Sequence, residues 1–206
     1  MGKLAVFFAE GYEEIEALTV VDVCRRCGLE VDMVAVPSKS SQSGAAAQHA
    51  TAQDKAAMTQ EERWVRSSHN VTVQMDKTFE QANFDEYDML VLPGGKLGTE
   101  NLEAHAGLMA QVDAFYREGR YVAAICAAPS ILGHRGILKG RKACCYPGFE
   151  GQLEGADVTN GPVEISGKVV TGKGMGASVD FALAIAGIFC GQDKADEMAA
   201  TICYRR

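Results

Sequence analysis

The sequence predicts an α/β fold in which a mostly parallel sheet is covered by helices on both faces. Three observations support this prediction. Short apolar runs bounded by polar residues, as buried strands are, alternate along the chain with segments of helical spacing. Glycine or proline residues end several of these segments. Strands that alternate with helices form parallel sheets whose two faces are both buried.

The first strand–helix–strand unit lies at the N-terminus. Residues 3–9 form an apolar run and are predicted to be a buried strand. Residues 13–27 carry apolar side chains at helical spacing and are followed by Gly28, where a helix is expected to stop. Residues 29–36 are predicted to be the second strand, which Pro37 ends. Such a unit is right-handed and parallel by default.

The same alternation returns after residue 86. Strands are predicted at 87–92, 121–125 and 168–171, and helices at 108–118, 127–133, 178–189 and 193–202. The helix at 178–189 is apolar nearly all round, which indicates that it is buried. In folds of this kind the functional site lies beyond the carboxyl ends of the strands, where the strand order changes.

Residues 38–68 do not fit the alternation. They are rich in Ser, Ala and Gln and are too long for an ordinary connection. We therefore expect one domain over 1–206 with a flexible or partly helical insertion at 38–68. Thr59 and Glu62 could cap a helical turn in it, and the only tryptophan, Trp64, is expected to anchor it.

Composition and charge narrow the class of protein. The 206 residues are 47% apolar and 23% charged, as in a globular domain. The net charge of -7 argues against binding to nucleic acid or anionic membranes. No apolar run reaches the ~20 residues of a membrane span, and acidic residues follow the first run too soon for a signal peptide. The odd number of cysteines, 7, then indicates free thiols in the cytoplasm.

Cys126 is the strongest candidate for a reactive residue. It directly follows the apolar run 121–125, and a helix is predicted to start at once. This strand–turn–helix elbow exposes a side chain above a sheet, and a helix N-terminus favours the thiolate. The alternative is a buried structural cysteine, because cysteine is among the most buried residue types. Position alone leaves the two interpretations equally supported.

Two further features could contribute to a site. Gly94 and Gly95 follow the predicted strand 87–92 and leave backbone N–H groups free to face a ligand oxygen, although a tight turn alone would also explain them. The first helix begins with Glu13, Glu14 and Glu16. Acids there usually complement the helix dipole. One of them could instead point over the sheet edge toward the cysteine, where burial would raise its pKa.

Other patterns carry less weight. Cys24 and Cys27 form a C-x-x-C pair, but at the C-terminal end of a helix, where the dipole disfavours a thiolate. Cys144 and Cys145 are adjacent, which is poor spacing for zinc ligands, and the four histidines show no ligand spacing. The glycines at 172–176 lack the dinucleotide-binding pattern. We predict no metal site.

Taken together, four motifs resemble the DJ-1/ThiJ/PfpI family. They are 11–17 (GYEEIEA), 91–98 (VLPGGKLG), 123–129 (AAICAAP) and 173–176 (KGMG) ahead of 180–185 (DFALAI). Their order and spacing match over almost the whole chain except the predicted insertion. The resemblance implies a flavodoxin-like three-layer sandwich, usually a homodimer, with no metal or organic cofactor.

The resemblance also implies roles for residues. Cys126 matches the reactive cysteine, and Glu16 matches the glutamate that hydrogen-bonds it. Gly94, Gly95 and Ala127 match the backbone donors beside the sulfur. On this basis Cys126 is expected to have the lowest pKa of the 7 thiols.

Three further positions can be compared with the family, one that matches it and two that differ. Arg26 matches an arginine near the dimer interface, and His69 stands where the family has a second interface arginine. Tyr146 stands where several relatives have a histidine near the cysteine, and an aromatic residue there resembles the bacterial branch. Because tyrosine is a poor general base at neutral pH, a Cys–His–acid protease is not expected.

The function implied by the resemblance is cysteine-dependent. It is a glyoxalase or deglycase activity on α-oxoaldehydes such as methylglyoxal, or on glycated substrates, through a hemithioacetal on Cys126. The alternative is an oxidative-stress sensor or redox-linked chaperone in which Cys126 oxidises to sulfinic acid. Both alternatives need the same activated thiol, so the sequence leaves them open.

Overall fold

The structure is a computed structural model that describes residues 2–37 and 63–205. Its main sheet is built from β1 (Lys3–Phe8), β2 (Glu30–Ala35), β5 (Lys77–Thr78), β6 (Met89–Leu92), β7 (Tyr121–Ile125), β10 (Val163–Ser166) and β11 (Val169–Gly172). The seven strands lie in the order β10-β11-β7-β6-β1-β2-β5. All neighbours are parallel except β10, which runs antiparallel to β11.

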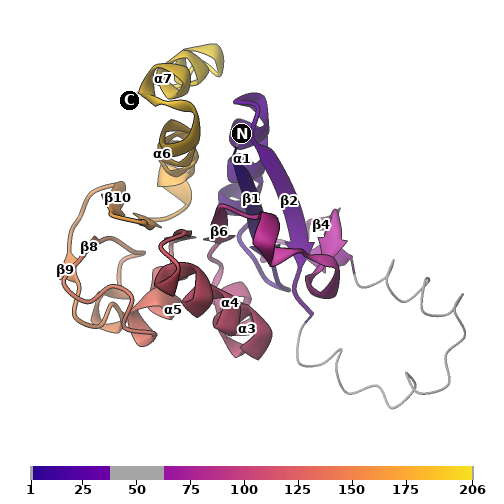
Figure 1. Cartoon of the computed structure of the whole chain (residues 1–206), viewed down its shortest axis with the longest axis vertical. Coiled ribbons are helices and arrows are strands. Elements are labelled where there is room, and N and C mark those ends of the chain that lie inside the picture. Colours follow the sequence, from indigo (N-terminus) through magenta and orange to yellow (C-terminus); the bar gives the residue numbers. More distant parts are fainter. Residues whose placement is uncertain (1, 38–62, 206) are drawn as a thin grey trace, which may run out of the picture.

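Helices cover both faces of this sheet (Figure 1). One face carries α1 (Glu14–Arg26), α6 (Ser178–Cys190) and α7 (Gln192–Thr201). The other carries α3 (Lys96–Ala104), α4 (Ala106–Arg117) and α5 (Pro129–His134). Each face has its own apolar core layer. The predicted three-layer α/β architecture is therefore confirmed.

The first strand shows why its sequence is continuously apolar. Leu4, Val6 and Phe8 point into the core layer under α1 and α6, whereas Ala5 and Phe7 point into the layer under α3, α4 and α5. All five are fully buried. Since successive side chains of a strand point to opposite faces, a strand covered on both sides needs apolar residues at every position.

The sheet order places a site between β1 and β6. From β1 the chain crosses to β2 on one side, and β6 lies on the other. This reversal of direction opens a crevice beyond the carboxyl ends of the strands, where ligands bind in doubly wound folds. Glu16, Gly94 and Cys126 follow β1, β6 and β7 in the chain, so the topology brings all three to this edge.

The helix α3 was not predicted from the sequence. The segment after β6 was interpreted as a glycine turn, yet a helix begins at Lys96. Position 98 must be glycine because a Cβ there would stand 2.7 Å from the Cα of Tyr12. Glycine has a low helix propensity, so it obscures the helix in the sequence. Close packing against the loop after β1 requires it all the same.

The predicted insertion is corrected at its C-terminal end. Trp64–Arg66 forms β3, which pairs antiparallel with β4 (Thr72–Gln74). Trp64 is 53% exposed and is not an anchor; its neighbour Val65, 5% exposed, packs into the core. The expected cap at Thr59 and Glu62 lies outside the described residues, as does the rest of 38–62.

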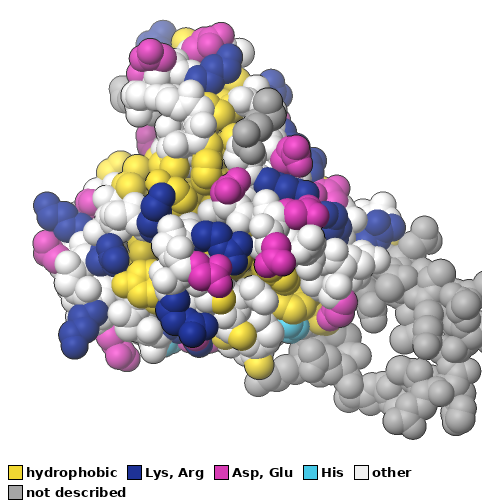
Figure 2. All heavy atoms as spheres, viewed as in Figure 1, with side chains coloured by type: hydrophobic (Ala, Val, Ile, Leu, Met, Phe, Trp, Pro, Cys, Tyr) yellow, Lys and Arg dark blue, Asp and Glu magenta, His cyan; other side chains and the backbone are white. Residues whose placement is uncertain are grey.

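Short elements complete the described chain. They are β8 (Lys142–Ala143) paired with β9 (Asp157–Val158), and 3-10 turns at Phe79–Gln81, Phe84–Glu86, Glu150–Gln152 and Met175–Ala177. Basic and acidic side chains are interspersed over the face seen in Figure 2. Among the helices described, none has both the length and the apolar character that crossing a bilayer requires.

Candidate active site

Cys126 sits on a tight turn between β7 and α5. Its φ of 66° lies in the left-handed region, which is uncommon for a residue with a side chain and is found at constrained sites. Two backbone hydrogen bonds hold the turn: the Cys126 N–H donates to the Gly172 carbonyl at 2.9 Å, and the Tyr146 N–H donates to the Cys126 carbonyl at 2.8 Å. The predicted elbow is present, and the thiol is partly exposed.

Glu16 is the acid that reaches the cysteine. It lies in the first turn of α1 and is fully buried. Its Oε2 accepts a 2.9 Å hydrogen bond from the Gly94 N–H, and its Oε1 has no hydrogen-bond partner of good geometry among the described residues. Burial raises the pKa of Glu16 to about 7, against the opposing effects of the Cys126 thiol and the Gly94 amide.

The electrostatics of Cys126 differ from the sequence-based expectation. Burial raises the pKa of its thiol, and the Glu16 carboxyl raises it further; the Gly95 and Ala127 amides act in the opposite direction. The expected lowest pKa among the thiols is therefore wrong for the resting site. The sequence shows the helix start, but not the depth of burial or the nearby negative charge. Because each anion disfavours the other, the pair holds one negative charge more readily than two.

The two glycines after β6 are required by close packing. A Cβ at Gly94 would stand 2.6 Å from the Cβ of Cys126 and 2.7 Å from Oε2 of Glu16. Gly95 has φ 85°, and a Cβ there would stand 2.4 Å from the Gly11 carbonyl oxygen. The roles of their amides differ from the expectation. Gly94 holds Glu16, so Gly95 and Ala127 remain as the amides that act on the sulfur.

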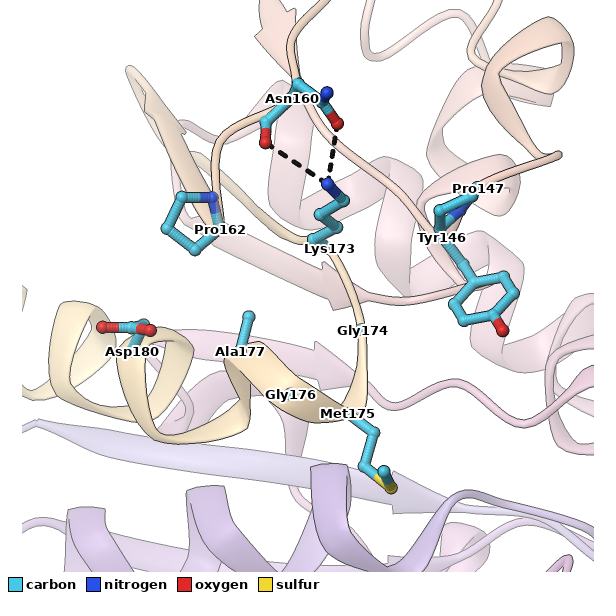
Figure 3. A pocket seen from close by; sticks show the side chains of 10 residues that line it. All are labelled: Tyr146, Pro147, Asn160, Pro162, Lys173, Gly174, Met175, Gly176, Ala177 and Asp180. Atoms are coloured by element: carbon cyan, nitrogen blue, oxygen red, sulfur yellow. Dashed lines mark hydrogen bonds between the residues drawn. The ribbon is translucent and has the colours of Figure 1, made fainter. Parts of the chain in front are cut away.

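A cavity of about 460 Å³ lies on the far side of Tyr146 and Gly174 from the cysteine, and Cys126 is not among its lining residues. Tyr146 and Gly174 form the wall nearest the sulfur, since a Cβ at Gly174 would lie 3.2 Å from the Tyr146 ring and 3.9 Å from the Cys126 Sγ. The Tyr146 side chain is half exposed. Figure 3 shows the Lys173 side chain extending toward Asn160, to whose Oδ1 it donates at 2.7 Å.

Lys173 and Asn160 were not predicted as site residues. Lys173 belongs to a motif that supported the family resemblance, but no role was assigned to it. Asn160 lies in a region without any periodic pattern, and only its fold-dependent approach to Lys173 brings it to the cavity. No signal in the sequence identifies it.

Arg26 and His69, the two remaining predicted residues, lie away from the sulfur. Arg26 is in the last turn of α1 and pairs with Asp22 at 2.9 Å. Ten residues separate it from Glu16, or ~15 Å along a helix. His69 lies beside the start of α1, with its Nδ1 3.1 Å from Oε1 of Glu14. Neither side chain is in contact with Cys126 in the described part of the chain.

Comparisons with known proteins agree with these motifs. The model of the DJ-1/PfpI family matches residues 2–187. A zebrafish protein, Parkinson disease protein 7 homolog, is 31% identical over 99% of this chain and 98% of its own. Protein DJ-1 homolog B of Arabidopsis thaliana is also 31% identical, but this chain spans 42% of its length. A protein of Pyrococcus abyssi named a deglycase is 34% identical over 53% of this chain and 66% of its own.

Solved structures give the same result. The oxidized DJ-1 of Toxoplasma gondii superimposes with a TM-score of 0.82 at 31% identity, over 100% of both chains. A mutant of a DJ-1 superfamily protein from Salmonella typhimurium gives a TM-score of 0.82 at 30% identity, again over 100% of both chains. The family suggested by the motifs is thereby confirmed, and this chain belongs to the DJ-1/PfpI family.

Proposed function

We propose that this protein is a cofactor-independent enzyme that converts α-oxoaldehydes such as methylglyoxal to hydroxy acids, with the related deglycase activity on glycated substrates. One observation carries the proposal: a fully buried carboxyl group with a raised pKa interacts with the thiol of a cysteine on a strained turn, and among the described residues its Oε1 has no other partner. The deglycase name of the partially matching archaeal relative supports the same class of chemistry.

The first step forms a bond between sulfur and carbon. Glu16 accepts the thiol proton of Cys126, and the thiolate attacks the aldehyde carbon of methylglyoxal. The aldehyde oxygen becomes an oxyanion, which the amides of Gly95 and Ala127 stabilise. Glu16 then returns its proton to this oxygen, giving a hemithioacetal and a carboxylate.

The second step moves a hydrogen between two carbons. The Glu16 carboxylate removes the proton from the former aldehyde carbon, and an enediolate forms with its negative charge on the former ketone oxygen. Glu16 delivers this proton to the neighbouring carbon, and the hydroxyl proton on the first carbon passes to the adjacent oxygen. The first carbon is thereby oxidised to a thioester and the second is reduced to an alcohol. Water then cleaves the thioester, which releases lactate and restores the Cys126 thiol. The net reaction adds one water and needs no external oxidant.

The test is lactate formation from methylglyoxal by four proteins. Wild type and Cys203→Ala are expected to be active, because Cys203 is exposed and lies beyond α7. Cys126→Ala is expected to be inactive. Glu16→Gln should keep the fold but lose at least ~100-fold in kcat/KM, as expected on removal of a general base. Full activity of Cys126→Ala would refute the proposal.

An oxidation-sensing or chaperone-linked function is the second candidate. Protonated Glu16 would donate from its Oε1 to a sulfinate on Cys126 and so protect that oxidation state. The partly exposed sulfur and the unpartnered Oε1 favour this candidate. Absence of lactate formation by the wild type, together with stable sulfinic acid at Cys126, would select it over the enzyme.

We also propose a homodimer formed through the surface where α1 lies beside β2 and β4. A groove of about 580 Å³ lies there, and its lining combines apolar with charged residues: Leu18, Val21, Met33 and Val73, with Asp22, Arg25 and Arg26. In this arrangement Arg26 serves the interface and not the chemistry. Sedimentation of the wild type and of Arg26→Glu, a change at an exposed position of the groove, tests it, and a monomeric wild type would refute it.

A further inference from the structure

A second group of cysteines lies far along α1 from the candidate active site. Cys24 and Cys27 stand at the C-terminal end of α1, and Cys190 is the last residue of α6. Both helices follow parallel strands and cover the same face of the sheet, so they run in the same direction and end at the same side. The fold therefore brings together cysteines that are 163 positions apart.

The contact between these two ends is direct. The Sγ of Cys190 lies 3.6 Å from the backbone carbonyl oxygen of Cys27 and donates to it. Cys27 is 9% exposed, and Cys190 is partly exposed. The contact places the Cys190 sulfur against the backbone of Cys27, and a disulfide between the two residues requires Cα atoms within roughly 7 Å.

The third residue of the group is a cation. Lys194 lies in the first turn of α7, which follows α6 after Gly191, and its charge acts on both sulfurs. The pKa of the Cys27 thiol is raised, chiefly by burial, with the Cys190 sulfur and Glu197 acting in the same direction and Lys194, which pairs with Glu197 at 2.8 Å, acting against them. A nearby ammonium group favours the thiolate, which is the reactive form in oxidation and disulfide formation.

Cys24 differs from Cys27 although both belong to the C-x-x-C pattern. Its Sγ is completely buried and lies 4.0 Å from the Ala182 carbonyl oxygen. Ala182 is eight residues before Cys190, or ~12 Å along α6. The Cys24 sulfur therefore faces the middle of α6. Cys190 also raises the pKa of Cys24, but its sulfur donates to the backbone of Cys27, so Cys27 is the member of the pair in direct contact with it.

We propose that Cys27 and Cys190 are a redox-active dithiol, which a peroxide converts to a disulfide that fastens the end of α1 to the end of α6. This inference is independent of the chemistry at Cys126. It gives a role to the C-x-x-C segment, whose second cysteine pairs across the fold and not within its own helix.

The reaction is balanced with peroxide as the oxidant. The more exposed Cys190 loses its proton, and its thiolate attacks one peroxide oxygen; the O–O bond breaks, and sulfenic acid and water form. The Cys27 thiolate then attacks the sulfenic sulfur. An S–S bond forms, the S–O bond breaks, and the hydroxide leaves as a second water. Two thiols lose two protons and two electrons, which reduce the peroxide to water.

Peptide mapping of the oxidised wild type tests the proposal. Reduced protein is treated with hydrogen peroxide, the remaining thiols are alkylated with iodoacetamide, and trypsin digestion follows without reductant. Cleavage after Arg25 and Arg26 places Cys24 and Cys27 on different peptides. The expected product is a link between the Cys27 and Cys190 peptides, with a mass lower by two hydrogens than their sum. A link through Cys24 or Cys203, or sulfinic acid at Cys190, would overturn the proposal.

Variants and a thermal measurement provide the second test. Cys190→Ser and Cys27→Ser should abolish the link, whereas Cys24→Ala and Cys203→Ala should retain it. Oxidation should raise the melting temperature of the Cys24→Ala protein by at least ~5 °C, because the bond closes a long loop, and should leave Cys190→Ser unchanged. A disulfide-linked dimer on a non-reducing gel, lost in either serine variant, would contradict the intramolecular bond.

Discussion

The Gly94 N–H donates a 2.9 Å hydrogen bond to Oε2 of Glu16. This contact joins the loop after β6 to the first turn of α1 and orients the carboxyl group beside Cys126. Among residues 2–37 and 63–205, it leaves Oε1 with no partner other than the Cys126 thiol, with which Glu16 interacts. A proton-transfer group needs a fixed orientation and one available oxygen. The hydrogen bond with Gly94 fixes the orientation of the carboxyl group through Oε2 and leaves Oε1 available for proton transfer.

The buried carboxyl group is expected to make stability depend on pH. Glu16 has a pKa of about 7 in the folded protein and 4.5 in its ordinary state. The folded form thus binds the proton more tightly than the unfolded form. The stabilisation of the folded state by protonated Glu16 is fully present below pH 4.5 and is lost as the pH rises to about 7. Relative to Glu16→Gln, the wild type should lose about 3 kcal/mol between pH 4 and pH 8.

Urea unfolding of both proteins at several pH values measures this difference. The variant is the control for all other titrating groups, because they are common to both chains. A difference in free energy of unfolding that stays constant from pH 4 to pH 8 would show that Glu16 titrates normally and is not buried as described.

Gly94→Ala is expected to inactivate the protein. The new Cβ would stand 2.6 Å from the Cβ of Cys126 and 2.7 Å from Oε2 of Glu16, so both groups must move. A displacement of ~1 Å costs ~100-fold in rate when reacting groups are misaligned. Gly151→Ala is the matched control, since a Cβ there has no neighbour within 4 Å. Equal kcat/KM of the two variants in the lactate assay would contradict the packing at Gly94.

The sequence was sufficient for the main layers of the fold. The strands β1, β2, β6, β7 and β11 and the helices α1, α4, α6 and α7 lie within two residues of their predicted starts and ends, because long apolar runs and helical spacing reflect burial in the core. The helix α3 was missed because the residue before it, Gly95, and a residue in its first turn, Gly98, are glycines required by neighbouring backbone. The edge strand β10, with partly exposed residues, gave no apolar run.

Part of the candidate site was likewise predictable from the sequence, and part was not. Cys126 was identified from its place after a buried strand, and the choice of Glu16 among three acids came from the resemblance. Its full burial now supplies the physical reason. Two features were not predictable: the raised pKa of Cys126 and the hydrogen bond from the Gly94 amide to Glu16. Both depend on contacts between three separate loops, which no local sequence pattern shows.

The hairpin of β3 and β4 provides a test of which side chain anchors it. Val65→Ala should lower the free energy of unfolding by ~2 kcal/mol, because a buried side chain leaves a cavity. Trp64→Ala should change it by less than ~0.5 kcal/mol, as surface substitutions do, since Trp64 is 53% exposed and Val65 only 5%. Chemical denaturation of both variants measures the difference. The reverse order would restore the tryptophan as the anchor.

Oxidation of Cys126 is expected to give sulfinic acid and no disulfide with the cysteines that follow β8. The sulfur of Cys144 lies 3.3 Å from the Thr171 carbonyl oxygen, and the Cys144 N–H donates to the Thr171 side chain at 3.0 Å. Cys145 packs in the core layer under α3, α4 and α5, whereas Cys126 packs against the opposite layer. Neither thiol is placed to resolve a sulfenic acid on Cys126, so a second oxygen adds instead.

Mass mapping after limited peroxide distinguishes the two products, because Arg135 and Lys142 place Cys126 and the Cys144–Cys145 pair on separate tryptic peptides. A gain of two oxygens on the Cys126 peptide is expected. Glu16→Ala removes the donor that would hold the sulfinate, so this variant should proceed to a gain of three oxygens under the same treatment. A disulfide link between the two peptides would contradict the positions of Cys144 and Cys145. Identical products in the wild type and in Glu16→Ala would show that Glu16 does not protect the oxidised sulfur.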